Sequence, residues 1–162
     1  CHSAPRRQTL ITMKPTVHIL NGPNLNLLGI REPHLYGHTT LAQVQARCEA
    51  LAAELGLGCV FRQSNHEGVL VDWVQEARAA GAAVIINPAG LSFRSIPLLD
   101  ALKTLDLPVI EVHITNIHRR DAPYQHSVTA LGATGVIAGL GPLGYELALH
   151  AVAQRLREAT TA

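Results

Sequence analysis

Aromatic side chains and charge of one sign are both scarce in this sequence. Phenylalanine, tyrosine and tryptophan make up 4% of the 162 residues, and the formal net charge at pH 7 is +1. Single-stranded nucleic acids bind to stacked aromatic rings on a basic surface, so this composition gives no support for a nucleic-acid partner. The near-neutral charge gives no basis for attraction to an acidic membrane either.

Long apolar runs and a paired set of cysteines are also missing. No apolar run reaches the roughly 20 residues that a membrane-spanning helix needs, so we expect no membrane association. The three cysteines, Cys1, Cys48 and Cys59, are scattered and odd in number. This argues against a disulfide framework and favours a reducing, cytoplasmic compartment. Cysteine and histidine show no zinc-finger spacing, and we expect no metal ion.

The length and the hydrophobic content of 48% suit one domain with a sizeable core. Residues 1–12 contain two arginines but lack the apolar centre of a secretory signal. We therefore expect a leader or disordered segment at 1–12, followed by a single domain at 13–162.

Within this domain, apolar segments alternate with amphipathic ones. The pattern predicts strands at 17–20, 58–63, 83–87, 109–114 and 135–138, and helices at 40–55, 67–80, 96–105 and 144–158. Strands that alternate with helices form right-handed βαβ units around a parallel sheet. The sequence therefore predicts an α/β fold, a flavodoxin-like three-layer sandwich with a five-stranded parallel sheet, whose ligand lies beyond the carboxyl ends of the strands.

The segment after the first predicted strand, residues 21–36, is too polar and too rich in glycine and proline for a core element. It is also longer than a usual loop of this kind, which indicates a functional loop. Arg31 and Tyr36 lie five residues apart in it. A guanidinium beside a phenol favours the phenolate, which can act as a general base. An ordinary surface turn is the alternative.

Strand alternation places Glu111 and His113 on one face of the fourth predicted strand. Parallel strands are normally buried on both faces, so this polar pair needs a reason. A carboxylate fixes the tautomer of an imidazole and stabilises its protonated form, which would make His113 a general acid. A purely structural ion pair is the alternative. Asn24 and Asn87 also follow strands and could orient substrate or water, although asparagine is a common turn residue as well.

Two other motifs do not support a function. Residues 139–144 read GLGPLG and match a dinucleotide-binding fingerprint, but that fold needs a further strand with an acidic residue, and only one helix remains. Ser92 and Ser95 lack the sequence of a nucleophile elbow, which argues against a hydrolase triad.

Taken together, the sequence resembles the type II 3-dehydroquinate dehydratases over roughly residues 17–152. The resemblance rests on LNGPNLNLLGIREPHLYG, RQSNHEG, INPAGL, PVIEVHITNIHRR and GVIAGLGPLGYELAL. It implies a flavodoxin-like homo-oligomer of trimers assembled into a dodecamer. It also implies cofactor-free anti elimination of water from the small molecule 3-dehydroquinate, giving 3-dehydroshikimate in the shikimate or quinate pathway.

The resemblance assigns the proton transfers to residues singled out above. Tyr36 would be the base that removes the C2 proton, with Arg31 as the cation that stabilises its phenolate. Asn24 would position a water against the enolate. His113, oriented by Glu111, would protonate the leaving hydroxyl. An enolate intermediate needs such a base, stabiliser and acid on separate sides of the ring.

The resemblance also assigns substrate binding. Asn87 and the backbone amides near Ile114 and Thr115 would hold the carboxylate, and Asp100 would reach a neighbouring subunit's site.

Three positions depart from the family pattern, and one of them is Leu99, which stands where an arginine usually precedes the aspartate. The other two lie on the diol side: Phe93 stands where the family has a histidine and Tyr124 where it has an arginine, and this histidine and arginine bind the ring hydroxyls. Losing such contacts weakens or redirects binding. The resemblance thus implies a dehydroquinate dehydratase, a hydro-lyase. The alternatives are a diverged dehydratase for a different β-hydroxy ketone, or a non-catalytic relative that binds a small carboxylate.

Overall fold

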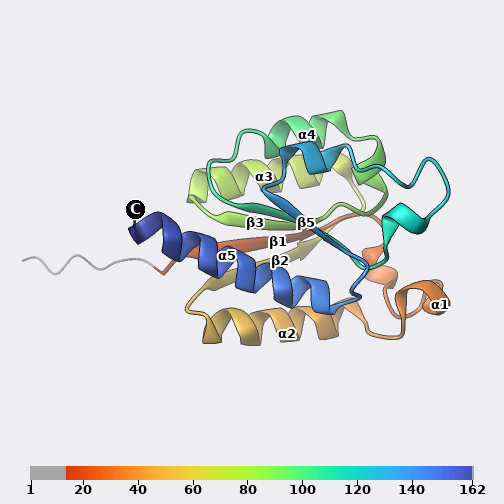
Figure 1. The fold of residues 1–162 in the computed structure, drawn as a ribbon, viewed down its shortest axis with the longest axis horizontal. Helices are drawn as coiled ribbons and strands as arrows, with labels where there is room; N and C mark the ends of the chain where they lie inside the picture. Colours follow the sequence, from red (N-terminus) through yellow and green to blue (C-terminus); the bar gives the residue numbers. More distant parts are fainter. Residues whose placement is uncertain (1–13, 162) are drawn as a thin grey trace, which may run out of the picture.

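A computed structural model describes residues 14–161 (Figure 1). The expected leader at 1–12 lies outside the described residues. The five strands are β1 (Thr16–Asn21), β2 (Gly58–Gln63), β3 (Ala83–Asn87), β4 (Val109–His113) and β5 (Gly135–Ala138). They form one parallel sheet in the order β2-β1-β3-β4-β5. The helices are α1 (Pro33–Tyr36), α2 (Leu41–Glu54), α3 (Glu67–Ala80), α4 (Ile96–Leu102) and α5 (Leu143–Thr161).

Helices cover both faces of the sheet, so the molecule has three layers (Figure 1). Alternate residues of β1 supply both cores. Val17 and Ile19 pack in the core under α2 and α5, while Leu20 packs in the core under α3 and α4. The predicted flavodoxin-like sandwich with a five-stranded parallel sheet is confirmed.

The four predicted long helices are present, and local signals explain their ends. The Thr40 and Gln43 side chains form a capping box at the start of α2. Gly81 ends α3 in the left-handed conformation. The predicted helix at 96–105 ends earlier, at Leu102. There the Thr104 hydroxyl donates to the Ala101 carbonyl and the backbone bonds change to a tighter three-residue spacing.

Short elements after the strand ends were not predicted. These are the one-turn helix α1 and the 3-10 helices η1 (Leu25–Leu27), η2 (Ala89–Phe93), η3 (Ile117–Arg119) and η4 (Thr129–Gly132). Each is too short to show a hydrophobic period. They follow the carboxyl ends of β1, β3 and β4 and so shape the edge of the sheet where a ligand is expected.

Register brings the polar strand ends together. Asn21, the last residue of β1, pairs with Gln63 of β2 and with Asn87 of β3. All three strands therefore end at one level, and their loops leave from one edge. None of the helices between residues 14 and 161 combines the length and apolar character needed to cross a membrane.

Candidate active site

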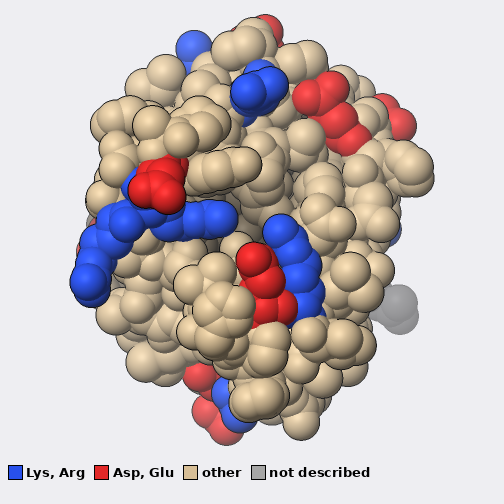
Figure 2. Space-filling model, turned by 90° about the vertical axis from the view of Figure 1, so that its right-hand side faces the viewer, with Lys and Arg blue, Asp and Glu red and all other residues tan. Residues whose placement is uncertain are grey.

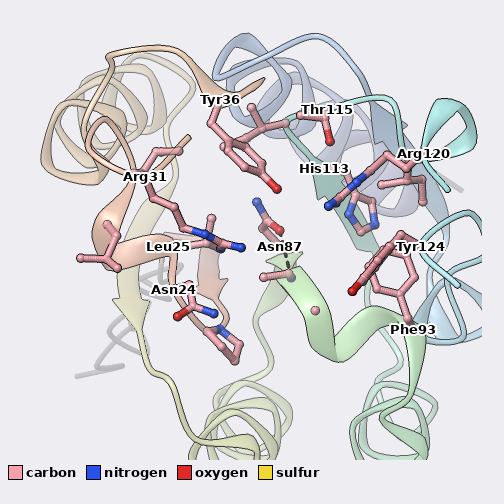
Figure 3. Close-up of a pocket in the computed structure, with 17 residues that line it drawn as sticks. Asn24, Leu25, Arg31, Tyr36, Asn87, Phe93, His113, Thr115, Arg120 and Tyr124 are labelled. Carbon is pink, nitrogen blue, oxygen red and sulfur yellow. Dashed lines mark hydrogen bonds between the residues drawn. The ribbon is translucent and has the colours of Figure 1, made fainter. Parts of the chain in front are cut away.

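A pocket lies at the carboxyl ends of β1, β3 and β4 (Figure 3). The predicted site residues that line it are Asn24, Arg31, Tyr36, Asn87, Phe93, His113, Ile114, Thr115 and Tyr124. They come from three strand ends and the loops after them. Glu111 lies behind His113, and Asp100 is exposed on α4 and does not line the pocket.

Tyr36 and Arg31 enter the pocket from the loop after β1. The Arg31 guanidinium carbon lies 6.0 Å from the centre of the Tyr36 ring, and the Tyr36 hydroxyl points into the pocket (Figure 3). Gly29 holds the two ends of this loop close, since a Cβ there would lie 2.8 Å from the His38 carbonyl oxygen. A cation over the ring favours the build-up of negative charge on the phenol.

His113 and Glu111 point to the same side of β4, as alternation predicts. His113 Nε2 lies 2.8 Å from Glu111 Oε2, and Glu111 is fully buried. A carboxylate at this distance accepts the Nε2 proton, which leaves Nδ1 as the ring nitrogen that can exchange a proton with a ligand. Such a histidine is suited to act as a general acid.

Asn87 is held by a buried chain of hydrogen bonds. Its Nδ2 donates to the Tyr145 hydroxyl at 3.0 Å, which donates to Asn21 Oδ1 at 2.7 Å. Its Oδ1 accepts from the Ala89 amide at 3.1 Å. Burial raises the pKa of Tyr145 well above its ordinary value, so the phenol stays protonated as a donor. The second Nδ2 hydrogen of Asn87 is thereby left for a ligand.

Asn24 follows β1 in the left-handed conformation, at φ 69°. Its backbone N–H donates to Asn65 Oδ1 at 2.9 Å, so the loop after β2 braces the loop after β1. Gly22 is needed just before this turn. A Cβ on Gly22 would lie 2.4 Å from the Pro88 carbonyl oxygen, because the β1 and β3 ends approach so closely.

Phe93 and Tyr124 form one wall of the pocket. Their rings meet edge to face with centres 5.5 Å apart, and the Phe93 ring lies 6.4 Å from the His113 ring. The Arg120 guanidinium carbon lies 4.9 Å from the centre of the Tyr124 ring (Figure 3). The wall thus consists of two aromatic rings and a cation, and it suits a ligand with a flat or partly apolar surface.

The electrostatics of the pocket favour an anion. Arg31 and Arg120 both line it, and Arg31 Nε lies 3.6 Å from Glu32 Oε2, outside the lining. Figure 2 shows basic side chains flanking a hollow on this face, with acidic side chains beside them. Sequence reasoning missed Arg120 because it lies in a polar segment without periodicity. It also missed Tyr145, because the contact with Asn87 joins residues 58 positions apart.

The glycine-rich turn 139–144 has a packing role in this fold. The Gly139 amide donates to the His113 carbonyl at 3.2 Å, and the Gly141 amide donates to the Ile114 carbonyl at 3.0 Å. A Cβ on Gly139 would lie 2.9 Å from the Cβ of Asn116. The turn therefore braces the end of β4 and its neighbours. Among the described residues, no group of three or more histidine, cysteine or acidic side chains gathers in metal-binding geometry.

Fold and pocket together define a flavodoxin-like α/β protein with a small-molecule site that is equipped for proton transfer. The family model for "Dehydroquinase class II" matches residues 15–153. The chain therefore belongs to the class II dehydroquinase family, as its sequence motifs predicted.

Individual relatives agree with this membership. The chain is 57% identical over 139 residues to a 3-dehydroquinate dehydratase of Caulobacter vibrioides, covering 86% of this chain and 94% of the relative. It is 55% identical over 141 residues to a 3-dehydroquinate dehydratase of Thermus thermophilus, covering 86% and 95%. A crystal structure of type II dehydroquinase from Propionibacterium acnes superimposes with a TM-score of 0.85 at 45% identity, covering 88% of this chain and 98% of that one. The activity that the curated relatives carry by name is that of a hydro-lyase.

Proposed function

We propose that this protein is a 3-dehydroquinate dehydratase that works through an enolate, with Tyr36 as base and His113 as acid. The Tyr36 phenolate removes the C2 proton, and the electron pair of that C–H bond moves into the enolate of the neighbouring ketone. The enolate then collapses and the C1–O bond breaks. The departing hydroxyl takes a proton from His113 and leaves as water, giving 3-dehydroshikimate.

The placement of Tyr36 and His113 carries this proposal. They come from different elements, the loop after β1 and the strand β4, and they line the same pocket. Arg31 over the Tyr36 ring supports the phenolate, and Glu111 beside His113 supports the imidazolium. Base and acid on separate elements suit an elimination, in which the proton and the leaving group depart from different carbons.

The same geometry supports binding of the substrate carboxylate by Asn87 and the backbone amides of residues 114 and 115. Asn87 keeps one amide hydrogen free for it, since the other is taken by Tyr145. Asn24 lines the pocket near the expected enolate and would hold a water there. Preorganised donors of this kind stabilise developing negative charge without reorganising during the reaction.

Absorbance in the near ultraviolet tests the activity, since the conjugated enone of the product absorbs where 3-dehydroquinate does not. We expect fast, saturable turnover by the purified protein and an about 1,000-fold loss of kcat in Tyr36→Phe, which keeps the ring but loses the base. Circular dichroism should show that the variant is folded. If folded Tyr36→Phe keeps the wild-type rate, Tyr36 is not the base.

A second function rests on the aromatic wall. Phe93 and Tyr124 offer one hydroxyl where two strongly polar side chains would suit a diol, and this favours a diverged dehydratase for a less hydroxylated β-hydroxy ketone. Absence of turnover of 3-dehydroquinate by a folded protein, combined with turnover of a deoxy analogue, would favour this alternative.

We further propose that the enzyme is cytoplasmic and assembles as trimers within a dodecamer. Cys48 and Cys59 are both free thiols, which suits a reducing compartment. Leu143 and Leu147, one turn apart on α5, are 51% and 36% exposed, and a neighbouring subunit could cover them. Asp100 is exposed outside the pocket, as expected of a residue that reaches a neighbour's site. Light scattering of the wild type and of Leu143→Glu tests the assembly.

A further inference from the structure

Two hydroxyl groups surround the carboxylate of Glu111 on the sides that His113 leaves open. Ser127 Oγ donates to Glu111 Oε2 at 2.6 Å, and Thr129 Oγ1 donates to Glu111 Oε1. Glu111 and Thr129 are both fully buried. With His113 Nε2 at 2.8 Å, the carboxylate has three donors around it.

The available hydrogens limit the directions that these bonds can take. Each hydroxyl has one hydrogen, and Ser127 Oγ already accepts from the Ala130 amide at 3.2 Å. With His113 Nε2 donating as well, all three neighbours donate to Glu111, and an ionised carboxylate, which only accepts, suits this arrangement. Ser127 Oγ and Thr129 Oγ1 lie 3.1 Å apart, and with both hydrogens directed at Glu111 they share no hydrogen bond.

Neutral hydrogen-bond donors suit the surroundings of the Glu111 carboxylate better than a cation would. A buried carboxylate without partners is very costly, and hydroxyl donors lower that cost without cancelling its charge. The negative charge therefore stays available to His113, which has to carry a proton before the elimination and release it during the elimination. An arginine in the same place would compete with the imidazolium for the carboxylate.

We propose that Ser127 and Thr129 are positioning residues, which hold Glu111 ionised and oriented so that His113 delivers its proton to the leaving hydroxyl. This inference rests on the proposed roles of Tyr36 and His113. When one hydroxyl is lost, Glu111 competes for the proton that His113 must donate, so collapse of the enolate slows. Removal of the C2 proton by Tyr36, on a different element, is unaffected.

Thr129→Val, which replaces the hydroxyl by a methyl group of similar size, gives the sharpest test. We expect kcat for elimination to fall about 10-fold to 100-fold with KM changed less than about threefold, as small misplacements of catalytic groups do. Thr129→Ser keeps the hydroxyl and should restore most of the rate. Ser127→Ala, at a less buried site, should behave like Thr129→Val and remains informative if the valine variant fails to fold.

Isotope exchange separates positioning from general damage. In D₂O, proton NMR follows the replacement of the C2 hydrogen of 3-dehydroquinate by deuterium, above the rate without enzyme. We expect Thr129→Val and Ser127→Ala to keep this exchange while elimination falls, because the enolate forms and returns. Thr104→Val is the matched control. It also removes a hydroxyl that donates to a buried neighbour, the Ala101 carbonyl, but lies outside the pocket.

The outcomes are distinct. Wild-type elimination in both folded variants overturns the inference, and so does a parallel loss of exchange and elimination, which would indicate a merely structural role. Failure of the proposed function itself shows up elsewhere, as wild-type turnover in folded Tyr36→Phe or as no turnover of 3-dehydroquinate by the unmodified protein.

Discussion

The Tyr145 hydroxyl in α5 accepts a hydrogen bond from the Asn87 side chain at 3.0 Å, although the two residues lie 58 positions apart. The same hydroxyl donates to Asn21 Oδ1, so it joins the ends of β1 and β3 beneath the pocket. The fully buried Tyr145 thus sets which way the Asn87 amide faces, and with it the geometry of the carboxylate contact proposed for Asn87.

Replacement of Tyr145 by phenylalanine should therefore affect both stability and substrate binding. Tyr145→Phe leaves Asn87 Nδ2 and Asn21 Oδ1 buried without this partner, which should lower the free energy of unfolding by about 1–3 kcal/mol. Without this bond the Asn87 amide is no longer held in one orientation, so KM should rise by about 10-fold with a smaller change in kcat. Urea unfolding and steady-state kinetics measure the two effects.

Phe61→Leu serves as the control, because the Phe61 ring lies 6.5 Å from the Tyr145 ring but makes no polar contact with Asn87. It should lower stability through packing and leave KM unchanged. An unchanged KM in Tyr145→Phe as well would show that Asn87 is held without the phenol.

Arg31 should matter for the rate through Tyr36. Without the cation over its ring the phenolate becomes costlier, so Arg31→Gln should lower kcat by about 100-fold. Arg31→Lys keeps the charge without the planar group and should lose less. The informative variant is the double replacement. If Arg31 acts through Tyr36, adding Arg31→Gln to Tyr36→Phe should cost almost nothing further, whereas full additivity of the two losses would assign Arg31 a separate role.

Much of this fold could be predicted because its local signals agree with its packing. The strands at 83–87 and 109–114 are continuous apolar or alternating runs, and Gly56 and Gly81 mark helix ends with left-handed backbone. The helix α1 was missed although Pro33 at its start and Gly37 after it are recognised signals, because four residues show no period.

The candidate site also has a part that the sequence predicts and a part that it does not. Glu111 and His113 could be predicted to lie on one face of β4, since strand alternation fixes which side each occupies. The partners of the pair, Ser127 and Thr129, reach it from the far end of a polar segment after β4. Their positions depend on tertiary packing, as do those of Tyr145 and Arg120, and no spacing rule in the sequence contains that information.

His18 gives a pH-dependent stability that is separate from catalysis. It lies buried in β1, and among the described residues its Nδ1 has no hydrogen-bond partner. Burial lowers the pKa of His18 from its ordinary value of 6.5, nearby Arg62 lowers it further, and Glu76 acts in the opposite direction. The unfolded chain therefore binds the proton more readily than the folded chain.

The sign of the effect follows from that difference. Stability from a neutral His18 is fully present above pH 6.5 and is lost as the pH falls below 6.5 toward the lower pKa of the folded state. His18→Leu should remove this loss. On going from pH 7.5 to pH 5, the Tm of the wild type should therefore fall more than the Tm of His18→Leu. A Tm difference for His18→Leu that stays constant with pH would mean that His18 does not titrate in this range.

The aromatic wall leads to a prediction about specificity. Phe93 lies between the Tyr124 and His113 rings, so a histidine at this position would present an N–H to the pocket at the same place. A polar group that bonds a substrate hydroxyl penalises an analogue that lacks it, because the buried group is then left without a partner. Phe93→His should therefore raise the preference in kcat/KM for 3-dehydroquinate over its 5-deoxy analogue by about 10-fold.

Phe93→Leu provides the comparison, since it alters the shape of the wall without adding a polar group. Its preference between the two substrates should stay at the wild-type value even if both rates fall. If Phe93→His and Phe93→Leu shift the preference equally, the change comes from lost stacking on Tyr124. A shift in Phe93→His alone would show that this position decides how strongly the pocket recognises ring hydroxyls, and that phenylalanine there makes the natural enzyme tolerant of their loss.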